Sequence, residues 1–211
     1  MKKNRQFTIL APRKHTIFMY LFFDTETTGL PKNWKAPLTD LDNWPRMVQL
    51  AWLMYDKNMQ LLDSQNFIIK PENYIIPEEV TKVHGITTER AEKDGQDLEM
   101  VLKIFADKIS QSQLLVAHNF SFDEKIVGAE FLRKNIKSKL FDLPHTCTME
   151  SSTDFCAIPN RNGYYGYKWP RLSELHKKLF GEVFEEAHNA FVDVSACAKC
   201  FFELKELGVI R

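Results

Sequence analysis

Runs of apolar residues separated by turn-forming residues predict the strands of a single sheet. The first run is rich in aromatic side chains and is typical of a buried strand. The short turn Asp56-Lys57-Asn58 joins the second run to the third, which favours antiparallel pairing of the first three strands. The expected strands cover residues 20–27, 47–55, 61–69, 114–117 and 145–149.

Apolar residues take up helical spacing after the third strand. Asp97 is expected to cap a helix with one apolar stripe, and Ser121 with Glu124 forms a capping box for another helix. The expected helices cover residues 77–84, 98–109, 122–134, 171–180 and 189–207. Three strands followed by alternating strands and helices predict an α/β fold. We expect a mixed five-stranded sheet, a three-strand antiparallel meander plus parallel strands, with helices on both faces.

Two acids, Asp24 and Glu26, stand at the end of the first strand. Residues two apart on a strand point to the same face, so both carboxylates project together. Like charges at this spacing repel, and a hard cation such as Mg²⁺ or Mn²⁺ between them removes the repulsion. Gly29 then allows a tight turn. The alternative is a solvated strand end with two exposed acids.

Three further ionisable residues stand where such chemistry would need them. Asp123 lies in the expected first turn of a helix, where an isolated acid is ordinary. Asp193 interrupts an apolar helix face, which is costly unless the carboxylate is paired or bound to metal. His188 can take a proton from water near neutral pH. Four carboxylates and one histidine match the needs of two-metal phosphodiester hydrolysis.

Composition narrows the partners and the compartment. The 211 residues include 28 basic and 28 acidic side chains, which argues against a whole-molecule electrostatic grip on nucleic acid but not against local basic patches. No apolar run approaches the ~18 residues of a membrane helix. Without a secretory signal, we expect a cytoplasmic location with free thiols. Cys197 and Cys200 lie within a helical stretch, so core packing is favoured over zinc binding.

Four segments in order carry a resemblance to a known family. They are Phe23-Asp24-Thr25-Glu26-Thr27-Thr28-Gly29, Val83-His84-Gly85-Ile86-Thr87, His118-Asn119-Phe120-Ser121-Phe122-Asp123 and His188-Asn189-Ala190-Phe191-Val192-Asp193. The chain resembles the DEDDh family of 3′–5′ exonucleases, and within it the proofreading epsilon subunits of bacterial DNA polymerase III. The resemblance covers residues 19–207 and implies an RNase H-like fold.

The resemblance also implies an activity and residue roles. It implies release of nucleoside 5′-monophosphates from the 3′ end of DNA, with two Mg²⁺ or Mn²⁺ ions. Asp24 would bridge both ions, and Glu26 with Asp193 would complete the site of the ion that carries the attacking water. Asp123 would support the second ion and His188 would be the general base. The terminal nucleotide would be held by Thr27, Thr28, Gly29, Leu30, His84, Asn119 and Phe122.

Other interpretations stay open at this point. An RNA-trimming exonuclease similar to oligoribonuclease or RNase T is one, and a catalytically silent nucleic-acid-binding module is another. Phe122 is also suited to a core position. The expected partners are single-stranded or frayed nucleic acid 3′ ends, and a DNA polymerase. The short stretch of chain after the last helix favours a free-standing or weakly attached exonuclease.

Three segments depart from a minimal family member. Residues 1–18 form a basic extension, interpreted as a dispensable arm or an upstream translation start, with a phosphate-binding arm as the alternative. Residues 19–211 are the expected exonuclease domain. In the long loop 31–46, Trp34 and Trp44 either stack on bases or anchor the loop. Residues 161–178 are aromatic and basic, and suit a single-stranded backbone.

Overall fold

The computed structural model describes residues 18–160, 165–182 and 189–210. Its strands are β1 Met19–Thr27, β2 Met47–Asp56, β3 Leu61–Ile68, β4 Leu114–Ala117 and β5 His145–Cys147. Its helices are α1 Glu78–His84, α2 Thr88–Asp94, α3 Leu98–Gln111, α4 Phe120–Arg133, α5 Thr148–Ser151, α6 Thr153–Cys156, α7 Leu172–Phe180 and α8 Ala190–Glu206. Every strand expected from the apolar pattern is present, with ends that differ by at most two residues.

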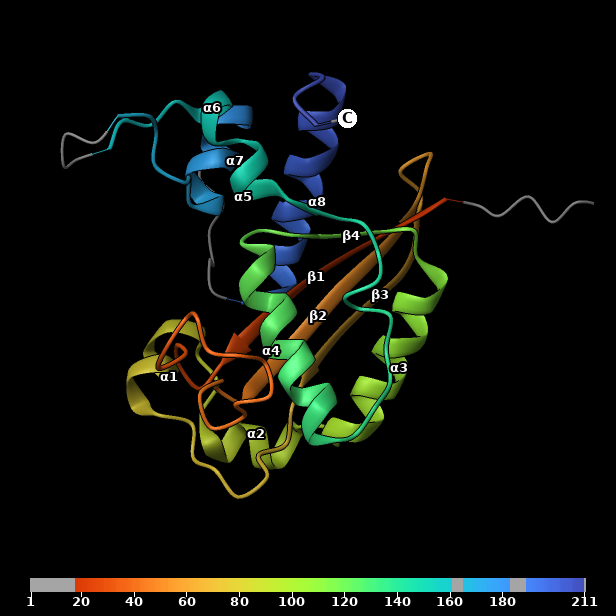
Figure 1. Ribbon diagram of the computed structural model, residues 1–211, viewed down its shortest axis with the longest axis vertical. Helices are drawn as coiled ribbons and strands as arrows, with labels where there is room; N and C mark the ends of the chain where they lie inside the picture. The colour runs from red at the N-terminus through yellow and green to blue at the C-terminus, as the bar shows by residue number, and fades with distance from the viewer. Residues whose placement is uncertain (1–17, 161–164, 183–188, 211) are drawn as a thin grey trace, which may run out of the picture.

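One sheet carries the fold, with the strands in the order β3-β2-β1-β4-β5 (Figure 1). Strand β1 pairs antiparallel with β2, and β2 pairs antiparallel with β3. Strands β4 and β5 continue the sheet in parallel on the other side of β1. This confirms the predicted meander with added parallel strands.

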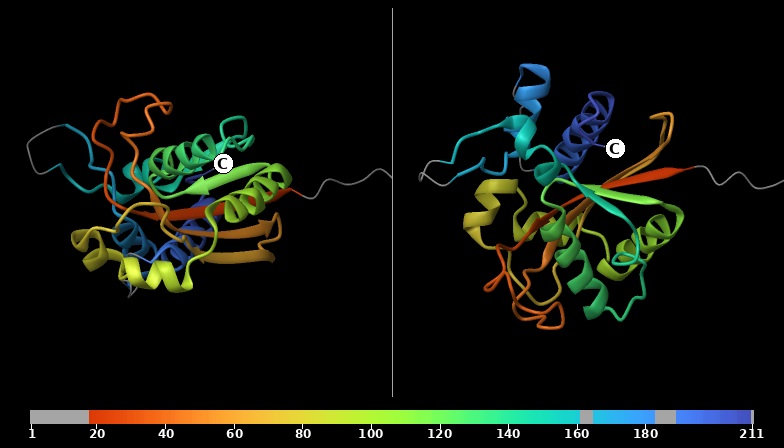
Figure 2. Two further views of the ribbon diagram at one scale, coloured as in Figure 1. Left: turned by 90° about the horizontal axis from the view of Figure 1, so that it is seen from below. Right: turned by 45° about the horizontal axis from the view of Figure 1, so that its top comes forward.

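Alternate residues of β1 bury opposite faces of the sheet. Leu21 and Phe23 pack into a core formed with α3 and α4, whereas Tyr20 and Phe22 pack into a core formed with α7 and α8. Figure 2, right, shows α3 and α4 on one side of the sheet and α8 on the other. Because the alternation has period two, the even-numbered residues that follow Phe22 face α8.

The start of α4 differs from the prediction. The helix begins at Phe120, and its N-cap Asn119 has a left-handed backbone with φ of 70° and no side-chain cap hydrogen bond. The capping box predicted from Ser121 and Glu124 is therefore wrong, because Ser121 already lies inside the helix. Strand β4 passes into α4 through two residues, so Asn119 must make the sharp turn that a conventional cap would otherwise make.

The short helices α2, α5 and α6 were not predicted. Helix α2 buries only Ala91 and has no apolar stripe, although Thr87 caps it by accepting from the Arg90 backbone N–H at 3.1 Å.

The four cysteines are buried free thiols, which agrees with the packing role expected for Cys197 and Cys200. Within the described part of the chain, no helix combines the length and hydrophobicity that a membrane span needs.

A buried ion-pair network fastens the β1–β2 loop to α4. The carboxylate of Glu130 is fully buried, and its Oε1 lies 2.9 Å from Nε of Arg46 and 3.0 Å from a guanidinium nitrogen of Arg133. Arg133 also donates to the backbone carbonyls of Leu41 and Trp44, at 2.6 and 2.7 Å. The second half of the loop is therefore held against α4 at both of its ends.

Replacing Glu130 with alanine should destabilise the protein by about 3 kcal/mol, because it leaves two partly buried arginines without their shared anion. The matched control is Glu99→Ala, which removes an exposed helix pair with Lys103 and should cost less than about 0.5 kcal/mol. Urea unfolding of both variants measures the difference. Equal losses would show that the network does not fasten the loop.

Candidate active site

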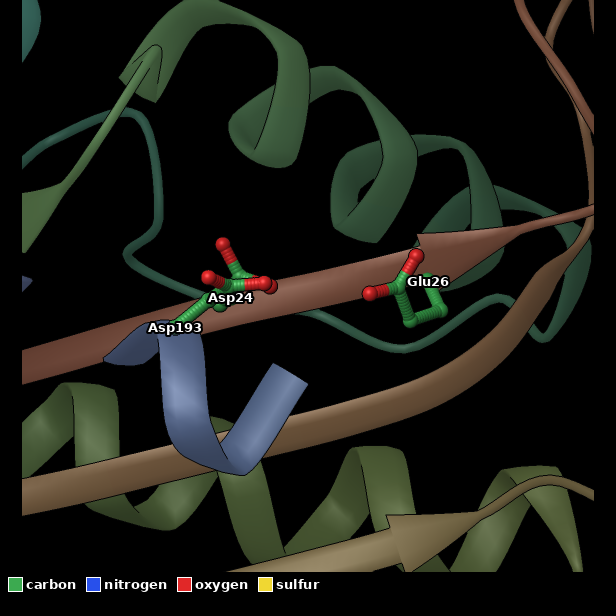
Figure 3. Close-up of side chains that lie close together, drawn as sticks. All are labelled: Asp24, Glu26 and Asp193. Atoms are coloured by element: carbon green, nitrogen blue, oxygen red, sulfur yellow. The ribbon is translucent and has the colours of Figure 1, made fainter. Parts of the chain in front are cut away.

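Three carboxylates meet where β1 approaches its carboxyl end. Asp24 and Glu26 come from the α8-facing side of β1, and Asp193 comes from α8 (Figure 3). One ligand oxygen from each lies within 4.8 Å of those of the other two. Asn189 caps α8 by accepting from the Phe191 backbone N–H at 3.1 Å, which sets Asp193 in the first turn of the helix. The convergence expected from the sequence is thus present for these three acids.

A fourth carboxylate reaches the cluster around the strand edge. Pairing between β4 and β1 ends at Phe22 and Val116, so the next residues of β1 have no strand beside them on that side. Asp123, from the first turn of α4, takes this place: its Oδ1 accepts from the backbone N–H of Thr25 at 3.0 Å and from its hydroxyl at 2.7 Å. The side chain of Asp123 is fixed there and almost fully buried.

Burial and crowding raise the pKa values of Asp24, Glu26 and Asp123. Burial raises the pKa of Asp24 well above its usual value, and the charges of Asp123, Asp193 and Glu26 raise it further. Burial, then Asp193 and Asp123, raises the pKa of Glu26 to about 8. Burial also raises the pKa of Asp123 to about 7, despite two hydrogen bonds from Thr25 that lower it. Oxygen ligands that repel each other in this way fit a hard divalent cation.

A cavity of about 260 Å³ opens beside Glu26. The residues that line it come from the end of β1, the following turn, α1 and α4. They are Thr25, Glu26, Thr27, Gly29, Leu30, Val80, Val83, His84 and Phe122. Five of the seven residues predicted to hold a terminal nucleotide are among them, so the structure brings that set together next to the acids.

The α1 residues of this cavity are positioned by the turn that ends the helix. Gly85 has a φ of 72° and closes α1 as its left-handed C-cap, a conformation that favours glycine. The buried His84 then accepts from the Ile86 backbone N–H through Nδ1 at 3.1 Å. Val80 and Val83 were missed from the sequence. The signal was that Val80 lies three residues before Val83 and four residues before His84, the spacings at which residues of one helix are neighbours.

The other two predicted nucleotide-binding residues do not line the cavity. Thr28 closes the base of the long loop: its N–H donates to the Arg46 carbonyl at 2.9 Å, and its hydroxyl accepts from the Arg46 N–H at 3.0 Å. Asn119 makes the turn into α4, and its carbonyl accepts from the Phe122 N–H at 2.9 Å. The structure shows backbone-shaping roles for both, and their contact with substrate stays a prediction.

Some predicted residues lie outside the described part of the chain. His188, the expected general base, falls there, as do the basic extension up to residue 17 and residues 161–164 of the aromatic and basic segment. Of that segment, Tyr165, Tyr167 and Trp169 are described and exposed.

The fold and the acidic cluster together define an RNase H-like nuclease. A family model described as exonuclease, named RNase_T, matches residues 21–201. The chain belongs to this exonuclease family, as a DEDD-type 3′–5′ exonuclease.

Curated relatives extend the comparison. The chain is 28% identical over 196 residues to the PolC-type DNA polymerase III of Mycoplasmopsis pulmonis, covering 90% of this chain and 12% of that protein. It is 30% identical over 183 residues to the same type of polymerase from Streptococcus pneumoniae serotype 2, covering 87% of this chain and 11% of that protein. The chain therefore spans only about a ninth of these relatives.

Solved structures share the fold. Escherichia coli exonuclease I in complex with a dA16 oligonucleotide superposes with a TM-score of 0.70 at 19% identity, covering 90% of this chain and 41% of that one. The complex of the same enzyme with a dT13 oligonucleotide gives 0.70 at 20% identity, covering 89% of this chain and 41% of that chain. At this level of identity, the likeness establishes the RNase H-like fold.

Replacing Glu26 with glutamine should stabilise the metal-free protein at alkaline pH. In the folded state Glu26 binds its proton more tightly than in the unfolded chain, where the ordinary value is 4.5. Its contribution to stability is therefore present at acid pH and is lost as the pH rises towards about 8. In EDTA at pH 8.5, the variant should melt about 3 °C or more above the wild type, and the gap should close at pH 5.

The control for this measurement is Glu206→Gln, which changes an exposed glutamate at the far end of α8. Thermal unfolding followed by circular dichroism measures all three proteins. Adding Mn²⁺ should raise the melting temperature of the wild type more than that of Glu26→Gln. A pH-independent gap between Glu26→Gln and wild type would contradict the account of the crowded acids.

Proposed function

We propose that this chain removes nucleoside 5′-monophosphates one at a time from the 3′ end of DNA, by phosphodiester hydrolysis with two divalent cations. One observation carries the proposal: three carboxylates lie within 4.8 Å of one another, and one of them, Glu26, also lines the adjacent cavity. A phosphodiester at the edge of the cavity would lie against the acids, while the terminal nucleoside would enter the cavity.

We give the acids the roles that the family resemblance implies, and their positions are compatible with these roles. Asp24, at the centre of the cluster, would contact both cations, which are Mg²⁺ or Mn²⁺ by the hardness of the carboxylate ligands. Glu26 and Asp193 complete the first cation site, and Asp123 supports the second from its fixed position on Thr25. Bound there, two cations would supply positive charge beside both the attacking and the leaving oxygen.

Residues of the chain itself would orient the substrate and accept the proton of the attacking water. Thr27 to Leu30, His84 and Phe122 hold the sugar and base so that the scissile phosphate faces the acids. The hydroxyl of Thr27 donates to the Gly29 carbonyl at 2.6 Å, which keeps this turn in one shape. His188 would accept the proton of the attacking water, since an imidazole titrates near neutral pH.

The choice of DNA is supported by the comparisons. The relatives found are PolC-type DNA polymerase III chains, and the exonuclease I structures contain dA16 and dT13 oligonucleotides. A related exonuclease I–single-stranded DNA complex is a zinc-bound form, which supports a divalent cation in this family. A DNA polymerase as a partner of this chain is part of the proposal on the same ground.

Replacing Asp24 with asparagine should abolish hydrolysis while leaving the protein folded, because the shape is kept and the cation ligand is lost. The assay is a time course on 5′-labelled single-stranded DNA, a duplex with a mismatched 3′ end, and RNA of matching sequence. We expect a ladder shortening from the 3′ end of DNA, present with Mg²⁺ and absent with EDTA. Full activity in Asp24→Asn would overturn the proposal, and faster shortening of RNA would reassign the substrate.

Replacing His188 with alanine should lower kcat by about 10²–10⁴-fold, as loss of a general base does. The expected drop should shrink at high pH, where hydroxide replaces the missing base. A matched control is His145→Ala, which removes an exposed imidazole at the start of β5. A His188→Ala enzyme with wild-type kcat at pH 7 would remove His188 from the mechanism.

A further inference from the structure

The two tryptophans of the β1–β2 loop have different surroundings. Trp44 is 2% exposed, and its indole N–H donates to the Pro37 carbonyl at 3.1 Å, so it anchors the loop. Trp34 is 47% exposed, and its ring lies against that of Phe122, with 5.8 Å between ring centroids and 44° between planes. Trp44 therefore serves to anchor the loop, whereas Trp34 presents much of its surface to solvent.

Trp34 is held in place by its neighbours in the loop. The Asn33 backbone N–H donates to Oδ1 of Asn43 at 2.7 Å, and the Asn43 amide donates to the Asn33 carbonyl at 3.0 Å. The buried Asn43 thereby clamps the main chain just before Trp34. The Trp34 carbonyl accepts from Nζ of Lys125 on α4 at 3.3 Å. An exposed aromatic ring on a fixed backbone is suited to binding, because little conformational freedom is lost on contact.

The position of Trp34 is just outside the cavity beside the acids. Phe122 lines that cavity, and Trp34 packs on Phe122 from the loop that follows β1, drawn in orange in Figure 1. The cavity of about 260 Å³ is below the ~300 Å³ at the low end of ligand sites. We place only the terminal nucleotide of a strand in this small cavity, so the next base would lie outside it, on the side of Phe122 where Trp34 packs.

Resting on the proposed function, we propose that Trp34 is a stacking platform for the second base from the 3′ end of a single strand. A base offers its face to an aromatic ring only when it is unpaired, and such stacking tolerates any sequence. Lys32 and Lys35 flank Trp34, are exposed, and form no ion pair with other described residues. Their charges are therefore available to backbone phosphates. The platform selects 3′ ends with at least two unpaired nucleotides.

Steady-state kinetics of Trp34→Ala on two substrates test this directly. The first is a single-stranded DNA 12-mer, which reaches the platform. The second is the methyl ester of thymidine 5′-monophosphate, which fills the cavity but carries no second base or aromatic group that could stack on Trp34. We expect KM for the 12-mer to rise by about 5- to 100-fold, with kcat nearly unchanged. KM for the ester should stay at the wild-type value. Trp34→Phe should restore most of the affinity for the 12-mer.

Controls separate this proposal from the proposed function. Phe18→Ala removes another exposed aromatic ring, at the opposite end of β1, and should change neither KM. If the wild type hydrolyses neither substrate, the proposed function fails. If Trp34→Ala keeps the wild-type KM for the 12-mer, or raises both KM values equally, the platform is refuted while the hydrolysis stands. The equal rise would mean that Trp34 only supports Phe122 by packing.

A spectroscopic measurement reads the stack itself. The base analogue 2-aminopurine is placed second from the 3′ end, and Asp24→Asn protein is used so that the strand stays intact. Binding should quench the fluorescence of the analogue, and adding Trp34→Ala to the same protein should remove most of the quenching. Equal quenching with and without Trp34 would overturn the proposal.

Discussion

The mutual repulsion of buried carboxylates at the end of β1 is the constraint on which the site depends. Asp24, Glu26 and Asp193 lie within ligand distance of one another, and Asp123 adds to the charge that raises the pKa of Asp24. Left to themselves, these side chains would move apart. Apolar cores on both faces of the sheet hold α4 and α8 against β1, so the protein keeps a locally unfavourable cluster in place and a divalent cation relieves it.

Much of this arrangement could be predicted because it follows from local periodicity. The period of two along β1 puts Asp24 and Glu26 on one face, and an acid on the apolar stripe of α8 identifies Asp193. The antiparallel meander also follows from the short second connection, and the added parallel strands follow from the switch to alternating strands and helices. Ordered motifs then tied these residues to one exonuclease family, which the family match over residues 21–201 confirms.

The parts that escaped prediction depend on contacts between distant segments. The place of Asp123 depends on where β4 stops pairing with β1, and no local pattern shows that point. The capping box at Ser121 failed because a left-handed Asn119 starts the helix two residues earlier. Trp34 and Trp44 look alike in the sequence, and only the folded loop shows that one is buried and the other exposed.

The most direct test of this account is the number of protons released when the wild-type protein binds Mn²⁺. Calorimetric titrations at pH 7 in two buffers with different ionisation enthalpies measure it. Because the pKa of Glu26 is raised to about 8 and that of Asp24 is raised as well, binding should release about one proton or more per protein. Binding without proton release would show that the acids are already ionised and would contradict the account.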